Sequence, residues 1–248
     1  MSTRRPVQGQ HARGALSRDR VLAAAVTLAD SEGLAAVTMR RLARTLGVEA
    51  MSLYHHLPGK EGLLDGLVEG IVREIDMAVV DLPAARTWRA SVRQRCLAAR
   101  TVMLRHPWAP GLLASRGTIP TGVLLHYEAI LGPMIEAGFS YHLGHRALHA
   151  LGSMALGFVQ ELFKPMPLDG AADLAQAELM RLADRLPHAV AMVQAELHAS
   201  DGRTLGWCDS QAEFEFTLDL LLDGLERKRQ AEARQRPSRA RRALAGSR

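Results

Sequence analysis

The sequence predicts an all-α protein with a small N-terminal head and a larger helical body. Apolar residues recur at intervals of three and four along most of the 248 residues, which is the period of a helix with one buried face. No stretch of useful length alternates apolar and polar residues as a half-buried strand does. Prolines fall between the periodic segments, where helices end, at Pro83, Pro107, Pro120 and Pro165.

Two helices are expected to open the head. The first covers residues 17–32, with Ser17 as N-cap, Gly33 as stop, and inward apolar residues at Val21, Leu22, Ala25, Leu28 and Ala29. The second begins after Thr38, which is also an N-cap residue, and ends at Gly47. It turns Leu42, Ala43 and Leu46 inward. Arg40, Arg41 and Arg44 then point elsewhere, because an unpaired charge is costly to bury.

The stretch from Gly47 to Leu57 predicts a turn and a short third helix, over residues 50–56. With Leu53 inward, its outer face carries Ala50, Met51, Ser52, Tyr54 and His56. Small residues at the start of such a helix allow its backbone to enter the major groove of DNA. Hydroxyl, phenol, imidazole and ammonium groups suit the flanking phosphates, and they are available at Ser52, Tyr54, His56 and Lys60.

Charge is distributed unevenly along the chain. Residues 1–60 carry a formal charge of +5, residues 61–225 carry −7, and residues 226–248 carry +7. A basic head on an acidic body favours a polyanion that contacts the head and is repelled by the body. The alternative is a solvated surface whose charges are merely uneven.

The body is expected to consist of longer helices. Periodic segments cover residues 61–80, 86–105, 120–137, 141–163, 171–199 and 209–230. Pro187 should kink or interrupt the 171–199 segment, and the Arg-rich end reads as disordered. The expected organisation is a basic flexible arm at 1–16, a helix-turn-helix domain at 17–62, a helical body at 63–230, and a basic disordered tail at 231–248.

The run "VTMRRLARTLGVEAMSLYHHLPGKEGLLDGL" resembles the head motif of the TetR family of bacterial transcriptional regulators. The resemblance covers residues 17–70 and implies a three-helix DNA-binding head, a connecting fourth helix, and a ligand-binding, dimerising body. It implies that Arg40 contacts a base edge or a phosphate, and that Ala50, Met51 and Ser52 face bases. It also implies phosphate contacts from Thr38, Tyr54, His56 and Lys60.

The segment "GFSYHLGHRALHALGSMALGFVQEL" resembles the long helix of the tetracycline-repressor subgroup, and Glu161 stands where that subgroup has a glutamate on its drug–metal side. Two departures matter. Ala50 and Met51 replace a Gln-Pro pair that reads bases in that subgroup, so the operator sequence of this protein cannot be inferred from the subgroup. "LLASRGTIP" has Ser115 nearest the position of the subgroup's metal-binding His, so no metal is expected.

A mostly apolar set in the body could line a ligand cavity between helices, although plain core is at least as good a reading for each member. The expected ligand-binding residues are Met103, Trp108, Leu112, Leu124, His126, Tyr127, Met154, Phe158 and Glu161. His142, His145 and His149 share one helical face, where an imidazole-rich surface competes with a metal site. No carboxylate or cysteine joins them.

Two helical segments of the body, 141–163 and 209–230, are expected to form a homodimer interface. The expected contacts are Leu148, Leu151, Phe214, Leu218, Leu221 and Leu225. The last four form a narrow apolar seam at helical spacing. The alternative is that this seam packs only within its own chain.

The most consistent function is that of a ligand-responsive repressor, released from a palindromic operator in double-stranded DNA by a small apolar effector. No nucleophile with a base, carboxylate pair or phosphate loop points to catalysis, and no cofactor is expected. Without a membrane-length apolar run or a signal peptide, the protein is expected to be cytoplasmic, and Cys96 and Cys208 to be buried thiols. The alternatives are a helical ligand-binding enzyme and a helical interaction protein without operator binding.

Overall fold

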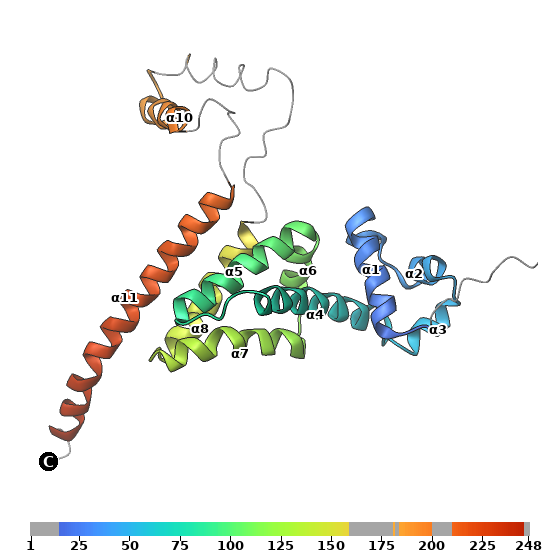
Figure 1. Ribbon diagram of the computed structural model, residues 1–248, viewed down its shortest axis with the longest axis horizontal. Coiled ribbons are helices and arrows are strands. Elements are labelled where there is room, and N and C mark those ends of the chain that lie inside the picture. Colours follow the sequence, from blue (N-terminus) through green and yellow to red (C-terminus); the bar gives the residue numbers. More distant parts are fainter. Residues whose placement is uncertain (1–14, 159–180, 182–183, 200–209, 246–248) are drawn as a thin grey trace, which may run out of the picture. The chain divides into compact units, whose positions relative to one another are not determined.

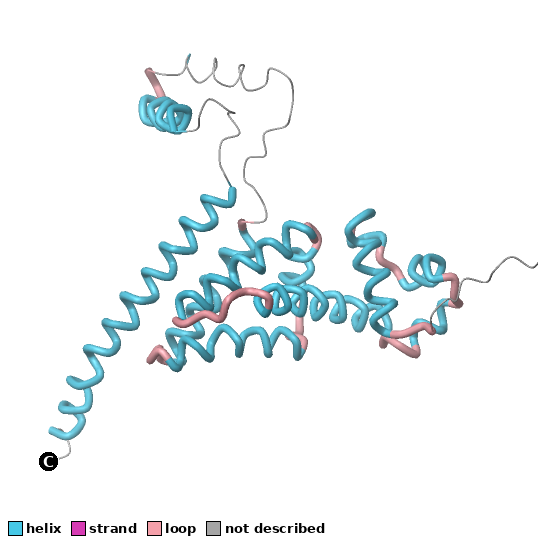
Figure 2. Tube along the Cα trace, viewed as in Figure 1, coloured by secondary structure: helices cyan, strands magenta, loops and turns pink. Residues whose placement is uncertain are grey.

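A computed structural model describes residues 15–158, 181, 184–199 and 210–245. These residues form helices joined by turns and short loops, and no strand occurs among them (Figure 2). The all-α fold is therefore confirmed. None of the helices in this part of the chain is long and apolar enough to cross a membrane.

The chain divides into two compact units, the first ending at Met134 and the second beginning at Ile135. The first contains α1 (Arg18–Glu32), the 3₁₀ turn η1 (Leu34–Ala36), α2 (Met39–Leu46), α3 (Ala50–Tyr54), α4 (Gly59–Val80), α5 (Trp88–Arg105), α6 (Ala109–Ser115) and most of α7 (Thr121–Glu136). The second contains α8 (Tyr141–Gly157), α10 (Pro187–Ala199) and α11 (Ser210–Ala245). In the first unit, α1, α2 and α3 gather at one end of α4 (Figure 1).

The predicted ends of the first two helices are confirmed. The Ser17 hydroxyl accepts a hydrogen bond from the Arg20 amide at 3.2 Å, and the Thr38 hydroxyl accepts one from the Arg41 amide, also at 3.2 Å. Gly33 ends α1 with φ 83°, and Gly47 ends α2 with φ 66°. Glycine suits both positions because side chains disfavour positive φ.

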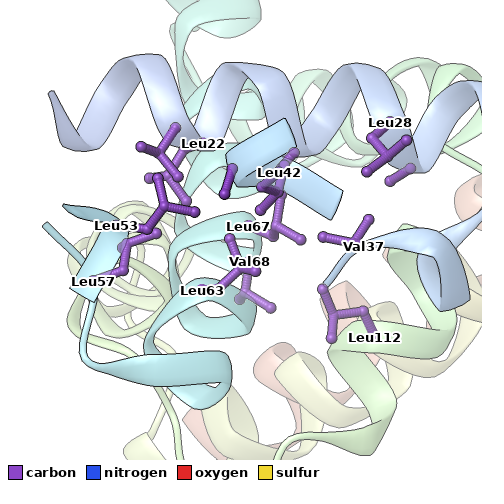
Figure 3. Close-up of a cluster of buried hydrophobic side chains, with 14 of the residues drawn as sticks. Leu22, Leu28, Val37, Leu42, Leu53, Leu57, Leu63, Leu67, Val68 and Leu112 are labelled. Carbon is purple, nitrogen blue, oxygen red and sulfur yellow. The ribbon is translucent and has the colours of Figure 1, made fainter. Parts of the chain in front are cut away.

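One apolar core joins the helices of the head. Leu22 of α1, Leu42 of α2 and Leu53 of α3 meet Leu67 of α4 there (Figure 3). Leu112 of α6 belongs to the same cluster. Burial of several Leu side chains, each worth about 1.5–3 kcal/mol, stabilises helices that are too short to persist alone.

Close backbone approach fixes α4 against α1. A Cβ atom built on Gly66 would lie 2.6 Å from Leu22 Cδ2, nearer than side chains tolerate. The N-terminal half of α4 therefore packs together with the helices of the head. The rest of α4 packs along α5.

Three elements differ from the sequence prediction. Helix α6 was missed because Pro107 suggested a break between helices; Pro110 lies in the first turn of α6, where no backbone donor is lost. The turn η1 was missed as well. Pro187 was expected to kink or interrupt the 171–199 segment, and α10 begins at that residue. Helix α11 continues to Ala245, which corrects the disordered assignment of residues 231–245. Alanine and arginine, abundant there, are strong helix formers.

The second unit is built on the contact between α8 and α11. Phe214, Leu218 and Leu222 have no exposed surface and form one stripe along α11. Leu143, Ala147 and other apolar residues of α8 are also buried. The rings of Phe158 and Phe214 meet edge to face, with centroids 5.6 Å apart.

Candidate nucleic-acid interface

Helices α2 and α3 form a helix-turn-helix held by the turn at Gly47. The Val48 amide donates a hydrogen bond to the Ala43 carbonyl at 3.0 Å, which closes the end of α2. Helix α3 is short, and Leu53 anchors it with no exposed surface. One buried leucine thus fixes which face of α3 points outward.

Only part of the outward face predicted for α3 is exposed. Met51 is 71% exposed and Tyr54 is 49% exposed, whereas Ser52 is half-buried, and Ala50 is half-buried and packs against the head core. His56, just after α3, is half-buried too. A phenol and a thioether therefore project from a helix whose first residues are small, as entry into a groove requires.

Three further candidate residues flank this face in the sequence. Thr38, Arg40 and Lys60 are all exposed. The Thr38 hydroxyl already caps α2, so a phosphate contact would be additional to the cap. Arg41 pairs with Glu32 at 2.7 Å, whereas no ion pair of Arg40 is found among the described residues.

An ion cluster ties the end of α6 to the start of α4. Arg116 Nη1 lies 2.8 Å from Glu61 Oε2, and Arg116 Nη2 lies 2.7 Å from Asp65 Oδ1. Burial lowers the pKa of the Arg116 guanidinium, but its hydrogen bonds to both carboxylates outweigh this effect and raise the pKa overall. The first two turns of α4 and the end of α6 are thereby held together.

A second cluster surrounds the buried side chain of His106, between α5 and α6. His106 Nδ1 lies 2.8 Å from Asp30 Oδ1 on α1, and His106 Nε2 lies 3.1 Å from Glu74 Oε2 on α4. The Trp108 indole also donates to Asp30 Oδ1, at 2.6 Å. The cluster links α1, α4 and the start of α6.

Sequence reasoning missed both clusters. The carboxylates of Glu61 and Asp65 stand four residues apart on α4, which is a recognisable sign of one helical face. Nothing in the sequence places Arg116 opposite them. The same holds for His106, whose partners lie 76 and 32 residues away.

The expected ligand-binding residues are only partly brought together. Leu112 is buried in the head core, and Trp108 packs against that core. Both were predicted to line a ligand pocket, and both belong instead to the contact between the head and the start of α6. Helix α6 was missing from the prediction, which is why their position was misread. Met103 is buried on α5, while Leu124 and Tyr127 are exposed on α7.

The remaining members of that set lie in different parts of the chain. His126 Nδ1 lies 2.9 Å from Asp76 Oδ1, which Arg95 also contacts at 2.7 Å. Met154 is buried and Phe158 is half-buried in the second unit. Glu161 lies outside the described residues.

The three-histidine face of α8 is exposed. The rings of His145 and His149 meet edge to face, with centroids 4.6 Å apart. His142 is exposed as well. Among the described residues, no group of three or more His, Cys, Asp or Glu is placed to hold a metal ion.

The expected dimer contacts need correction. Phe214, Leu218 and Leu225 are buried within their own chain, as is Leu151, so their side chains are not offered to a partner. Leu148 and Leu221 are half-buried. The exposed apolar residues of α11 are instead Phe216, at 62%, and Leu220, at 52%. Helical spacing identified the seam but could not tell which helix covers it.

Residues 21–67 match the family model described as bacterial regulatory proteins of the tetR family. Residues 82–229 match the model described as a tetracyclin repressor-like C-terminal domain. The chain belongs to the TetR family. The first match contains the helix-turn-helix of α2 and α3, and the second begins after α4.

Individual relatives support the assignment to the TetR family. The transcriptional repressor DrrR1 of Streptomyces coeruleorubidus is 30% identical, over 90% of this chain and 81% of DrrR1. A transcriptional regulator of Saccharopolyspora erythraea is 31% identical over 54% of this chain, a match that spans just over half, 56%, of that relative. The fold resembles apo ActR of Streptomyces coelicolor, with a TM-score of 0.71, 23% identity, and coverage of 88% of this chain and 98% of ActR.

TetR-family proteins of this kind are ligand-responsive transcriptional repressors, and this chain is one of them. It is a regulator and not an enzyme, which removes the first of the two alternatives. The head motif and the family match also disfavour an interaction protein without DNA binding.

Proposed function

We propose that this TetR-family protein is a homodimeric repressor that binds a palindromic operator and releases it when the body binds a small, largely apolar effector. The observation that carries the DNA-binding part is the exposed face of α3, with Met51 and Tyr54 standing out above the fully buried Leu53. Two heads would enter successive major grooves, with half-sites about 34–36 Å apart.

Individual head residues take the following roles. Ala50, Met51 and Ser52 face base edges, since they occupy the start of α3, where small groups allow close approach. Arg40 contacts a base edge or a phosphate from α2. Thr38, Tyr54, His56 and Lys60 hold phosphates, which fix the register of the head on the duplex.

The dimer is proposed to form through α8 and the outer face of α11. Phe216 and Leu220 lie four residues apart and are both exposed, so they form an apolar stripe opposite the side that packs on α8. Exposed aromatic and leucine side chains side by side are typical of interfaces between chains.

Effector binding is proposed to act through α6. Leu112 belongs to the head core and Arg116 grips the first turns of α4, so a displacement of α6 is transmitted to the head. An effector shifts the population toward release only by its differential affinity for the two arrangements. In the first unit, Met103, Leu124 and Tyr127 are proposed to supply apolar surface for such a molecule, with His126 as a polar anchor. No metal is required. ActR, similar in fold, has been solved in complex with actinorhodin.

Substitutions in the head test the proposal. Arg40→Ala should weaken binding to a selected operator by about 1–3 kcal/mol. Tyr54→Phe, which removes only a hydroxyl, should weaken binding to all duplexes alike. Tyr141→Phe, on the exposed start of α8, is the matched control and should bind as the unsubstituted protein does. Unchanged operator affinity in both head variants, measured by fluorescence anisotropy, would refute the assignment.

A further inference from the structure

Helix α11 continues for about twenty residues past the part that packs in the second unit. Leu225 is its last buried residue, and from Glu226 to Gln235 every side chain is exposed or half-buried. The helix nevertheless runs to Ala245. At 1.5 Å per residue, this basic extension, residues 226–245, is about 30 Å long.

The basic extension is strongly cationic. It contains eight Lys or Arg and only two Glu. One of the arginines serves the body: Arg229 donates to Glu226 and to the Ala137 carbonyl at 3.0 Å. Arg227, Lys228 and Arg234 carry exposed cationic side chains. The sequence adds Arg236, Arg239, Arg241 and Arg242.

The composition of the extension favours a nucleic acid over a membrane surface as its partner. A helix that lies on a membrane needs an apolar face with large side chains, and residues 226–243 offer only alanines and one proline as apolar residues. In the sequence, its Lys and Arg residues occur at changing intervals, without the period of three and four that would gather them on one helical face. Such an arrangement suits the phosphates of a nucleic-acid backbone, which are contacted without sequence readout.

We propose that the basic extension of α11 is a second DNA-binding element, which binds the backbone of duplex DNA independently of base sequence. It goes beyond operator recognition by the head, and it relies on the proposed function only because the head keeps duplex DNA nearby at high effective concentration. The extension raises total affinity for DNA and makes it more dependent on salt, while the head alone determines the operator.

Salt titration with the full chain tests this proposal. The probe is a fluorescein-labelled random-sequence duplex without the operator, followed by anisotropy. The neutral variant replaces Arg227, Lys228, Arg234, Arg239, Arg241 and Arg242 by Gln; the matched control replaces the five arginines among them by Lys. Each lost phosphate contact should reduce the slope of log K against log salt by about 0.9, so the neutral variant should lose about 2 units or more. The control should keep the slope.

Two variants with three substitutions each control for misfolding of the sixfold variant. One neutralises Arg227, Lys228 and Arg234, and the other neutralises Arg239, Arg241 and Arg242. Each should give part of the loss while retaining the helical circular dichroism of the full chain. An unchanged slope in all neutral variants overturns the proposal, as does tail-dependent binding to phosphatidylserine vesicles with an unchanged DNA slope. Failure of the proposed operator recognition by the head gives a different result. In that case Arg40→Ala leaves the sequence preference of the protein intact, and this result does not depend on the extension.

Discussion

Arg116 at the end of α6 contacts one oxygen of Asp65 on α4 twice: Nε donates a hydrogen bond to Oδ1 at 3.0 Å, and Nη2 forms an ion pair with the same oxygen at 2.7 Å. The Arg116 side chain is only 12% exposed. The pair therefore joins a helix of the body to the first turns of the helix that completes the head core. A displacement of α6 would therefore act on the head through this ion pair.

Replacing Arg116 should destabilise the protein more than replacing an exposed arginine. Arg116→Gln leaves Glu61 and Asp65 without their partner, and because both carboxylates retain some hydration we expect a loss of about 1–2 kcal/mol instead of the full cost of a buried pair. Arg41→Gln, the control, breaks a pair whose arginine side chain is 42% exposed and should cost less than about 1 kcal/mol. Urea unfolding measures both; equal losses would contradict a special role for Arg116.

Two glycines of α4 should respond oppositely to the same substitution. Gly66→Ala places a methyl group 2.6 Å from Leu22 Cδ2, and the overpacking of about 1–3 kcal/mol outweighs the gain in helix propensity. Gly70→Ala meets no atom within 4 Å and should stabilise by about 0.5–1 kcal/mol. Thermal unfolding of the two variants decides the matter, and a stabilised Gly66→Ala protein would mean that α1 and α4 are not in close contact.

The Cys96 thiol should be inert in the folded protein. Burial raises its pKa to about 12, so almost no thiolate exists at pH 8, and the thiolate is the reactive form. In a Cys208→Ser background, a thiol reagent at pH 8 should label Cys96 only when denaturant unfolds the chain. Rapid labelling without denaturant would show that α5 is open to solvent at this position.

Two leucines of α11 distinguish the core from the proposed dimer interface. Leu220→Arg, at an exposed position, should leave a folded monomer that has lost operator affinity, because a charge at an apolar interface is not tolerated. Leu218→Arg, at a position without exposed surface, should instead unfold the second unit. Light scattering and circular dichroism separate these outcomes. A Leu220→Arg protein that remains dimeric would place the interface elsewhere.

Local chemistry explains what the sequence could predict. Ser17, Thr38, Gly33 and Gly47 act within a few residues of their own position, so the ends of α1 and α2 were predicted correctly. Proline misled the prediction at α6, because its effect depends on whether it lies in the first turn or the interior of a helix. At Pro187 the expected interruption coincides with the start of α10. Without α6, Trp108 and Leu112 were assigned to a pocket instead of to the joint with the head.

Contacts between distant segments explain what the sequence could not predict. The apolar spacing on α11 was evident, but spacing does not reveal that α8 of the same chain covers Phe214 and Leu218. The ion clusters at Arg116 and His106 join residues 32 to 76 positions apart, and no local pattern marks such pairs. The exposed face of α3 was predictable since it depends on a single inward residue, Leu53.

Selection of bound sequences from random duplex DNA tests the central claim, that the exposed face of α3 reads a palindromic operator, most directly. The account predicts enrichment of an inverted repeat whose half-sites lie about one helical turn, or a multiple of it, apart. The same selection with Arg40→Ala should show a relaxed preference at one position of each half-site if that side chain contacts a base, and uniformly weaker binding if it contacts a phosphate. Recovery of no enriched motif, or of an unpaired motif indifferent to Arg40 and Tyr54, would contradict the account.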